Sequence, residues 1–199
     1  MKRILFLAAV GLITASAVKA QVVIKPSAGV NFTDFSKNQS NGEFKAKPGY
    51  QVGGSVELGQ KVYIEPGLFY VRKSTQFRST TEGTDNINYN ISGIRIPVAI
   101  GAHFIGNDKS PVSLRGFAGA SAFIMTRIED LDMKDFNRAS WGAFAGLGLD
   151  LSIVFFEAKY EWSLTNLKKD VTQIDVGKSR TLFLNAGVRL PLGGGPRTK

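Results

Sequence analysis

Apolar and polar residues alternate along most of this chain with a period of two, which predicts β-strands. The clearest case runs over 11 residues, where an apolar side chain occupies every second position from Ile94 to Phe104. The same alternation recurs over 139–150 and 179–191. A transmembrane β-strand needs about 9 to 11 residues, so these apolar faces are long enough to cross a membrane.

Eight such segments follow one another, separated by polar stretches. The stretches after the second, fourth and sixth are short, whereas the segments near 34–48, 75–89, 127–138 and 167–178 are long and polar. Short periplasmic turns alternating with long outer loops are typical of outer-membrane barrels. We therefore predict an all-β fold, an eight-stranded antiparallel up-and-down transmembrane β-barrel, with strands at 22–33, 49–58, 61–74, 90–104, 112–126, 139–150, 153–166 and 179–191.

The two faces of these strands differ in a way that argues against a soluble barrel. A soluble antiparallel sheet turns a polar face to water, but here glycine and small residues lie on the polar face and the opposite face is uninterruptedly apolar. This arrangement is the one expected when lipid surrounds the barrel and the polar face lines its interior.

Aromatic residues give a second indication of a membrane, because Trp and Tyr concentrate at the headgroup level on the lipid side. Seven of them share the apolar parity of their strands and lie near strand ends; scattered core aromatics are the alternative. The predicted interfacial aromatics are Phe32, Tyr50, Tyr70, Trp141 and Trp162 near the long loops, and Phe104 and Phe156 at the opposite ends.

The first 20 residues have the layout of a signal peptide, with Lys2 and Arg3 before an apolar stretch that ends in small residues. Val18 and Ala20 occupy the positions where a signal peptidase needs small side chains, which predicts cleavage after Ala20. The alternative, a permanent anchor, would need about 20 consecutive apolar residues, and this run is shorter and interrupted. The predicted organisation is a signal peptide at 1–20, a barrel domain at 21–192 and a flexible tail at 193–199.

Composition narrows the chemistry further. The chain of 199 residues has no cysteine, which excludes disulfides, thiolate metal sites and cysteine nucleophiles. Its formal net charge of +9 is spread along the sequence and mixed with acidic residues in the loops, so no basic stripe for nucleic acid is present. The excess is expected either to meet anionic lipopolysaccharide or simply to reflect scattered lysines.

Among the charged residues at strand positions that face the barrel interior, four are acidic and four are basic. An eight-stranded barrel is only wide enough for side chains to fill, and buried charges are costly unless paired, so we predict a lumen plugged by ion pairs. The alternative is a narrow polar channel in which Arg95 or Arg115 selects anions. The predicted network consists of Glu57, Glu65, Glu157 and Glu161 with Arg95, Arg115, Lys159 and Arg189, beside the inward rings of Phe69, Phe117, Phe144, Phe155 and Phe183.

Catalytic and metal chemistry find little support. The single histidine, His103, lies near a periplasmic strand end, and Ser121 and Glu65 are not framed by a nucleophile motif, so we predict no enzyme and no catalytic residues. No phosphate-binding loop is present, and we predict no cofactor. The best acidic group is interleaved with basic residues at a spacing unlike that of a calcium loop, so we predict a solvated loop at Glu129, Asp130, Asp132 and Asp135.

Several motifs resemble those of the small outer-membrane β-barrel domain family common in Bacteroidetes, which includes the PorT-type proteins. They are the segments Ala28 to Phe32, Glu65 to Tyr70, Ile94 to Pro97 and Lys159 to Leu167. The resemblance implies a barrel fold and an outer-membrane address but no reaction. Such barrels usually end in an aromatic residue, whereas this chain continues to Lys199, which leaves insertion to internal residues of the last strand or makes the tail a periplasmic extension.

These observations lead to one main functional hypothesis and two alternatives. The first is a non-enzymatic outer-membrane barrel with a plugged lumen, acting in envelope structure or loop-mediated binding. The second is a narrow pore or transporter component for small solutes, and the resemblance adds an accessory part in protein secretion or gliding machinery. The expected partners are outer-membrane lipid and lipopolysaccharide, the outer-membrane assembly machinery, and an extracellular or envelope protein, but not nucleic acid.

Overall fold

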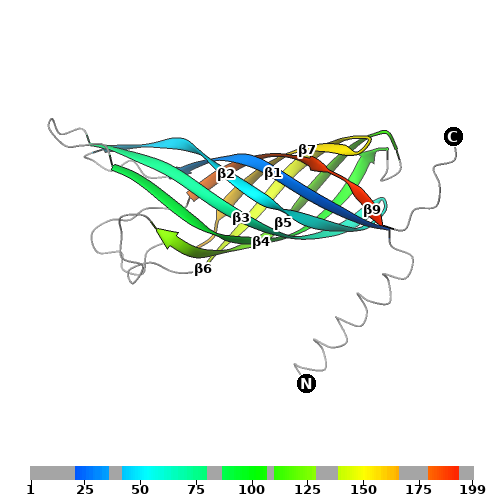
Figure 1. The fold of residues 1–199 in the computed structure, drawn as a ribbon, viewed down its shortest axis with the longest axis horizontal. Coiled ribbons are helices and arrows are strands. Elements are labelled where there is room, and N and C mark those ends of the chain that lie inside the picture. The colour runs from blue at the N-terminus through cyan, green and yellow to red at the C-terminus, as the bar shows by residue number, and fades with distance from the viewer. Residues whose placement is uncertain are drawn as a thin grey trace, which may run out of the picture.

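The computed structural model describes residues 21–35, 42–79, 87–106, 110–128, 139–165 and 179–192, and it is an elongated antiparallel barrel (Figure 1). No helix within these ranges is long and apolar enough to cross a membrane. The strands are β1 (Val22–Phe35), β2 (Gly42–Gly59), β3 (Val62–Ser79), β4 (Ile87–Ile105), β5 (Val112–Ile128), β6 (Ala139–Leu151), β7 (Val154–Ser163), β8 (Ser179–Val188) and β9 (Leu190–Leu192).

The sheet closes on itself. Each strand from β2 to β8 pairs antiparallel with its neighbour in sequence, and β1 pairs with β2 on one side and with both β8 and β9 on the other. Since β8 and β9 are separated only by Arg189, they form one course around the barrel. The predicted eight-stranded up-and-down barrel is therefore confirmed, and where β1 pairs on both sides the sheet has no exposed edge.

One end of the barrel carries tight turns. Gly59 at the end of β2 and Gly106 after β4 have φ values of 141° and 71°, in the left-handed region that favours glycine. Ser152 takes a φ of 59° in the turn between β6 and β7. Val22 pairs with Leu192, so the first and last described strands meet at this same end, on the right of Figure 1.

The opposite end differs from the prediction, because three strands are longer than the alternation indicated by three to seven residues and β1 and β5 are longer by two. β2 begins at Gly42 rather than 49, β3 continues to Ser79, and β4 begins at Ile87, so parts of the expected loops 34–48 and 75–89 are strand. The pairing of β2 with β3 shifts register between Lys47 and Tyr50. Pro48 lies in that irregularity and cannot donate a ladder hydrogen bond, and such a break hides the continuation of a strand from a period-two pattern.

Two other boundaries also move. β7 ends at Ser163 rather than 166, and the last predicted strand is interrupted at Arg189. The predicted signal peptide, the tail at 193–199 and the segments 129–138 and 166–178 lie outside the described residues.

The barrel is apolar outside and polar inside. Along β4, Ile94, Ile96, Val98 and Ile100 are exposed on the outer surface, while Arg95 between them is fully buried. The strand pattern thus places its charged side chains in the lumen, which is the reverse of a water-soluble sheet with an apolar core.

The apolar outer face generates a depth-dependent prediction. Val98→Arg places a charge midway along the apolar face of β4, and we expect it to lower the free energy of unfolding in lipid vesicles by about 2–4 kcal/mol. Ile105→Arg, at the short-turn end of the same strand, is the matched control and should cost at most about 1 kcal/mol. If urea unfolding gives the two variants the same loss in free energy of unfolding, the apolar face of β4 is not embedded in the membrane.

Candidate functional site in the barrel lumen

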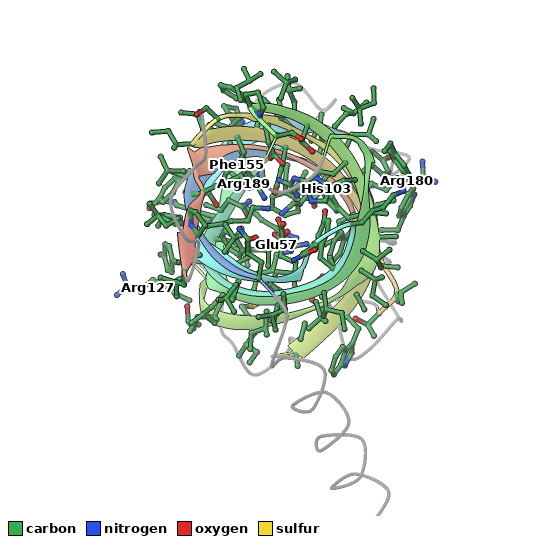
Figure 2. The ribbon with its side chains drawn as sticks, turned by 90° about the vertical axis from the view of Figure 1, so that its right-hand side faces the viewer. Glu57, His103, Arg127, Phe155, Arg180 and Arg189 are labelled. Carbon is green, nitrogen blue, oxygen red and sulfur yellow. The ribbon has the colours of Figure 1, made fainter. Side chains whose placement is uncertain are left out.

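The half of the lumen near the tight turns holds a cluster of buried charges, here called the inner cluster. Its four cations and four carboxylates are each at most 5% exposed, and their formal charges cancel. Figure 2, which looks into the barrel from this end, shows Glu57, His103 and Arg189 pointing into the ring of strands. The inner cluster consists of Lys25, Arg115, Lys159 and Arg189 with Glu57, Glu65, Asp150 and Glu157.

Lys25 on β1 is one centre of the inner cluster. Its Nζ lies 2.8 Å from Glu65 Oε2, 2.8 Å from Glu157 Oε1 and 3.6 Å from Glu57 Oε2. Glu65 lies on β3 and Glu157 on β7, neither of which pairs with β1 in this part of the barrel. The ammonium therefore joins carboxylates across the lumen rather than along its wall.

Arg115 on β5 is the second centre. Its Nη2 lies 2.5 Å from Glu157 Oε1, its Nε 3.1 Å from Asp150 Oδ1, and its Nη1 3.5 Å from Glu65 Oε2. Nη1 also donates a hydrogen bond of 3.2 Å to the hydroxyl of Tyr63. Because Lys25 and Arg115 share Glu65 and Glu157, the two centres form one network.

Further contacts extend this network around the barrel. Arg189 bonds Glu57 at 3.1 Å and Asp150 at 3.2 Å, and Lys159 lies 2.6 Å from Glu157. His103 Nε2 lies 3.4 Å from Glu57 Oε1. Every strand course contributes, with Lys25 on β1, Glu57 on β2, Glu65 on β3, His103 on β4, Arg115 on β5, Asp150 on β6, Glu157 on β7 and Arg189 between β8 and β9.

Aromatic rings fill the space beside these charges. Lys25 Nζ lies 4.6 Å from the centre of the Phe155 ring, and Lys159 Nζ lies 5.3 Å from that of Phe117. A Cβ at Gly146 would lie 2.6 Å from the Phe117 ring, so only glycine leaves room for it there. The inward rings are all buried, namely Phe69, Phe117, Phe123, Phe144, Phe155 and Phe183.

A second group of charges, here called the outer cluster, lies toward the long-loop end and consists of Arg95, Glu161 and Lys73. Arg95 Nε and Nη2 donate to the same Glu161 oxygen at 2.8 and 2.5 Å, and Ser121 Oγ donates to that oxygen at 2.7 Å. The Arg95 guanidinium lies 4.8 Å from the centre of the Phe183 ring. Within the described part of the chain the lumen therefore contains two groups of charges, of which the inner cluster is balanced and the outer cluster is not.

The eight charged residues predicted from the sequence all lie in the lumen but not in one group. Arg95 and Glu161 pair with each other, and the other six belong to the inner cluster. Sequence reasoning missed Lys25, Asp150 and Lys73. Parity was the available signal for them, because each shares the inward alternation of its strand.

The seven predicted interfacial aromatics are exposed on the outer surface of the barrel. Tyr50 and Tyr70 lie with their ring centres 6.3 Å apart, and Trp162 packs edge-on against Tyr160 at 4.9 Å. Trp162 lies near the long-loop end of β7, as predicted, but Tyr50 and Tyr70 lie midway along β2 and β3, because both strands continue farther than the alternation indicated. Their place at a membrane interface stays a prediction.

The residues considered for hydrolysis do not come together as a catalytic group. His103 Nδ1 lies 2.6 Å from Ser113 Oγ, whereas Ser121 bonds Glu161 and Glu65 bonds Lys25. Within the described ranges no group of three histidine or acidic side chains is arranged to hold a metal ion. The acidic group at 129–135 lies outside those ranges.

A closed antiparallel barrel with an apolar exterior and a charged interior defines the class of small outer-membrane β-barrels. A sequence model of the outer membrane protein beta-barrel domain family matches residues 19–169, and the chain belongs to this family. Membership in its Bacteroidetes or PorT-type branch remains an expectation from the motifs. No curated protein matches the chain.

A solved structure of an outer-membrane protein agrees on the fold. The outer membrane protein OprG from Pseudomonas aeruginosa is 11% identical, with a TM-score of 0.51 over 90% of this chain and 99% of that one. The Ail protein of Yersinia pestis, in complex with the heparin analogue sucrose octasulfate, is 15% identical with a TM-score of 0.46, covering 87% and 100% of the two chains. At such identities the likeness to OprG shows a shared fold alone.

Charge balance in the inner cluster generates a prediction for Glu157. Glu157→Gln leaves Lys25, Arg115 and Lys159 without their shared carboxylate, and we expect a loss of about 3–5 kcal/mol in the free energy of unfolding. The double variant Glu157→Gln, Lys159→Met leaves three cations and three carboxylates, and it should be more stable than Glu157→Gln alone. Urea unfolding of the two single variants and the double variant checks this. If the double variant loses as much free energy of unfolding as the two single variants together, charge balance does not stabilise the inner cluster.

Proposed function

We propose that this chain is a non-enzymatic integral outer-membrane protein whose lumen is closed by the inner cluster and which acts in envelope structure or in binding at its outer rim. The observation that carries the proposal is that side chains from all eight strand courses join one charge-balanced network across the lumen.

A solute crossing the lumen would have to separate these pairs. Removing one partner from a buried ion pair costs about 3–5 kcal/mol, because the remaining charge is neither hydrated nor paired. Phe117 and Phe155 occupy the space beside the same cations, at 5.5 and 5.6 Å from Arg115 Cζ. A barrel of eight strands leaves little room for solvent once such side chains fill it.

Unequal strand lengths support a role at the outer rim. β2, β3 and β4 have 18, 18 and 19 residues, whereas β6, β7 and β8 have 13, 10 and 10. Within the described residues, β1 pairs with β2 only as far as Phe32 and Pro48, but β2 and β3 remain paired out to Gly42 and Ser79. The three long strands project beyond the rest of the barrel at the left of Figure 1. Such a sheet offers backbone edges to which a protein partner can add a strand.

Export and finer family membership belong to the same proposal. Cleavage after Ala20 would release a barrel domain of 21–192 with a tail at 193–199, facing lipopolysaccharide outside and inserted by the outer-membrane assembly machinery. The PorT-type motifs support an accessory part in a secretion or gliding machinery, which uses the outer rim rather than the lumen.

Closure of the lumen predicts electrical silence. The refolded barrel in a planar bilayer should give no unitary currents across ±100 mV on the order of hours, while a general porin added to the same membrane should conduct. Reproducible unitary steps from the purified barrel would contradict a closed lumen and favour the narrow pore for small solutes.

Membrane insertion and export have their own test. The expressed protein should fractionate with the outer membrane, begin at Gln21, and migrate differently on a detergent gel before and after boiling, because a closed barrel resists detergent until heated. A soluble periplasmic protein without a mobility shift would overturn the proposal.

A further inference from the structure

The outer cluster carries an excess of positive charge. Arg95 and Lys73 contribute two cations, and Glu161 is the one carboxylate that pairs with either of them among the described residues. The inner cluster, by contrast, balances four cations with four carboxylates. Uncompensated charge in a desolvated interior is costly, so the outer cluster favours an added anion.

Arg95 retains an unused donor. The side chain is fully buried, and its Nε and Nη2 are both directed to Glu161, but its Nη1 has no hydrogen-bond partner among the described residues. Buried guanidinium nitrogens are almost always hydrogen-bonded, so an unsatisfied one points to a ligand or a solvent molecule. Ser121 Oγ donates to the same Glu161 oxygen as Arg95 Nε and Nη2. Arg95 Nη1 takes no part in this group of hydrogen bonds.

Lys73 supplies the second cation. Its Nζ lies 5.0 Å from the centre of the Phe123 ring and 5.9 Å from that of Phe183, and no described carboxylate forms an ion pair with it. The Arg95 guanidinium contacts the same Phe183 ring at 4.8 Å, so the two cations lie beside one aromatic side chain. Two cations without a second carboxylate, held near one ring, are an arrangement that attracts an anion.

We infer that the outer half of the lumen binds one small monovalent anion, of halide size, between Lys73 and Arg95. Buried rings of Phe69, Phe123 and Phe183 surround this region, which limits the size of the ligand and strengthens its attraction to the cations. Lys73 lies toward the long-loop end of β3 and is partly exposed, so the anion enters from outside the cell. The site does not depend on closure of the inner cluster, and its failure would leave the proposed function intact.

The test uses linkage between anion binding and unfolding. The urea midpoint of the refolded barrel, measured as folded and unfolded bands on an unboiled gel, is compared in sodium bromide and in sodium gluconate at equal ionic strength. An anion that binds only the folded state raises the midpoint as its concentration rises. We expect such a rise with bromide, and none with gluconate, which is too large for the site.

Variants locate the effect. Lys73→Met should weaken the apparent affinity for bromide at least about tenfold, since a charged partner is lost. Lys73→Arg should retain the rise, and Arg95→Lys, which keeps the pair with Glu161 but lacks the unused nitrogen, should reduce it. Arg127→Met removes an exposed cation that points away from the lumen (Figure 2) and should behave as wild type.

Two results would overturn the inference. One is a wild-type midpoint that is equal in bromide and gluconate. The other is a bromide effect that persists unchanged in Lys73→Met or disappears equally in Arg127→Met, since either would assign the effect to general screening of surface charge.

Discussion

The pairing of buried charges inside the barrel is the interaction on which the rest of this structure depends. A strand pattern with apolar residues toward lipid sends every inward charge into a narrow lumen, where an unpaired charge is costly. Lys25 and Arg115 resolve this by sharing Glu65 and Glu157 across the lumen. Because these contacts connect strands far apart around the barrel, they also fix its cross-section.

Packing follows from the same constraint. Long cationic side chains reach the centre only if their neighbours are small, and a Cβ at Gly148 would lie 2.8 Å from Arg115 Cζ. Phe117 and Phe155 then fill the space that the charges leave and contact the cations through their ring faces. Inward glycines, rings and ion pairs are therefore one solution to filling a barrel of eight strands, and they explain the polar face seen in the sequence.

Much of this could be predicted from alternation alone. Period two located all eight strand courses and the inward parity of Arg95, Arg115 and Glu157, because a strand fixes the side of each residue. Alternation does not fix which inward residues meet, since that depends on strand tilt and pairing around the barrel. The pairing separates Arg95 and Glu161 from the other charges and brings Lys25 into the centre.

The strand extensions show a second limit of the pattern. The outer parts of β2, β3 and β4 resembled loops because polar residues are frequent there and Pro48 interrupts β2. Backbone pairing nevertheless continues in these parts, as between Phe77 and Ile87. The alternation predicted that Tyr50 and Trp141 lie on the outer surface. It did not predict that β2, β3 and β4 project beyond the other strands.

A direct test of the central claim is the hydrogen exchange of the Lys25 ammonium group in the refolded barrel, followed by NMR on ¹⁵N-labelled lysine. Lys25 is fully buried among three carboxylates, and Lys61 at the tight-turn end is exposed and serves as the internal reference. A closed, paired network predicts a Lys25 ammonium signal that persists at neutral pH while that of Lys61 is lost to exchange with water. Exchange of Lys25 as fast as that of Lys61 would show that water reaches the inner cluster freely and would contradict the account.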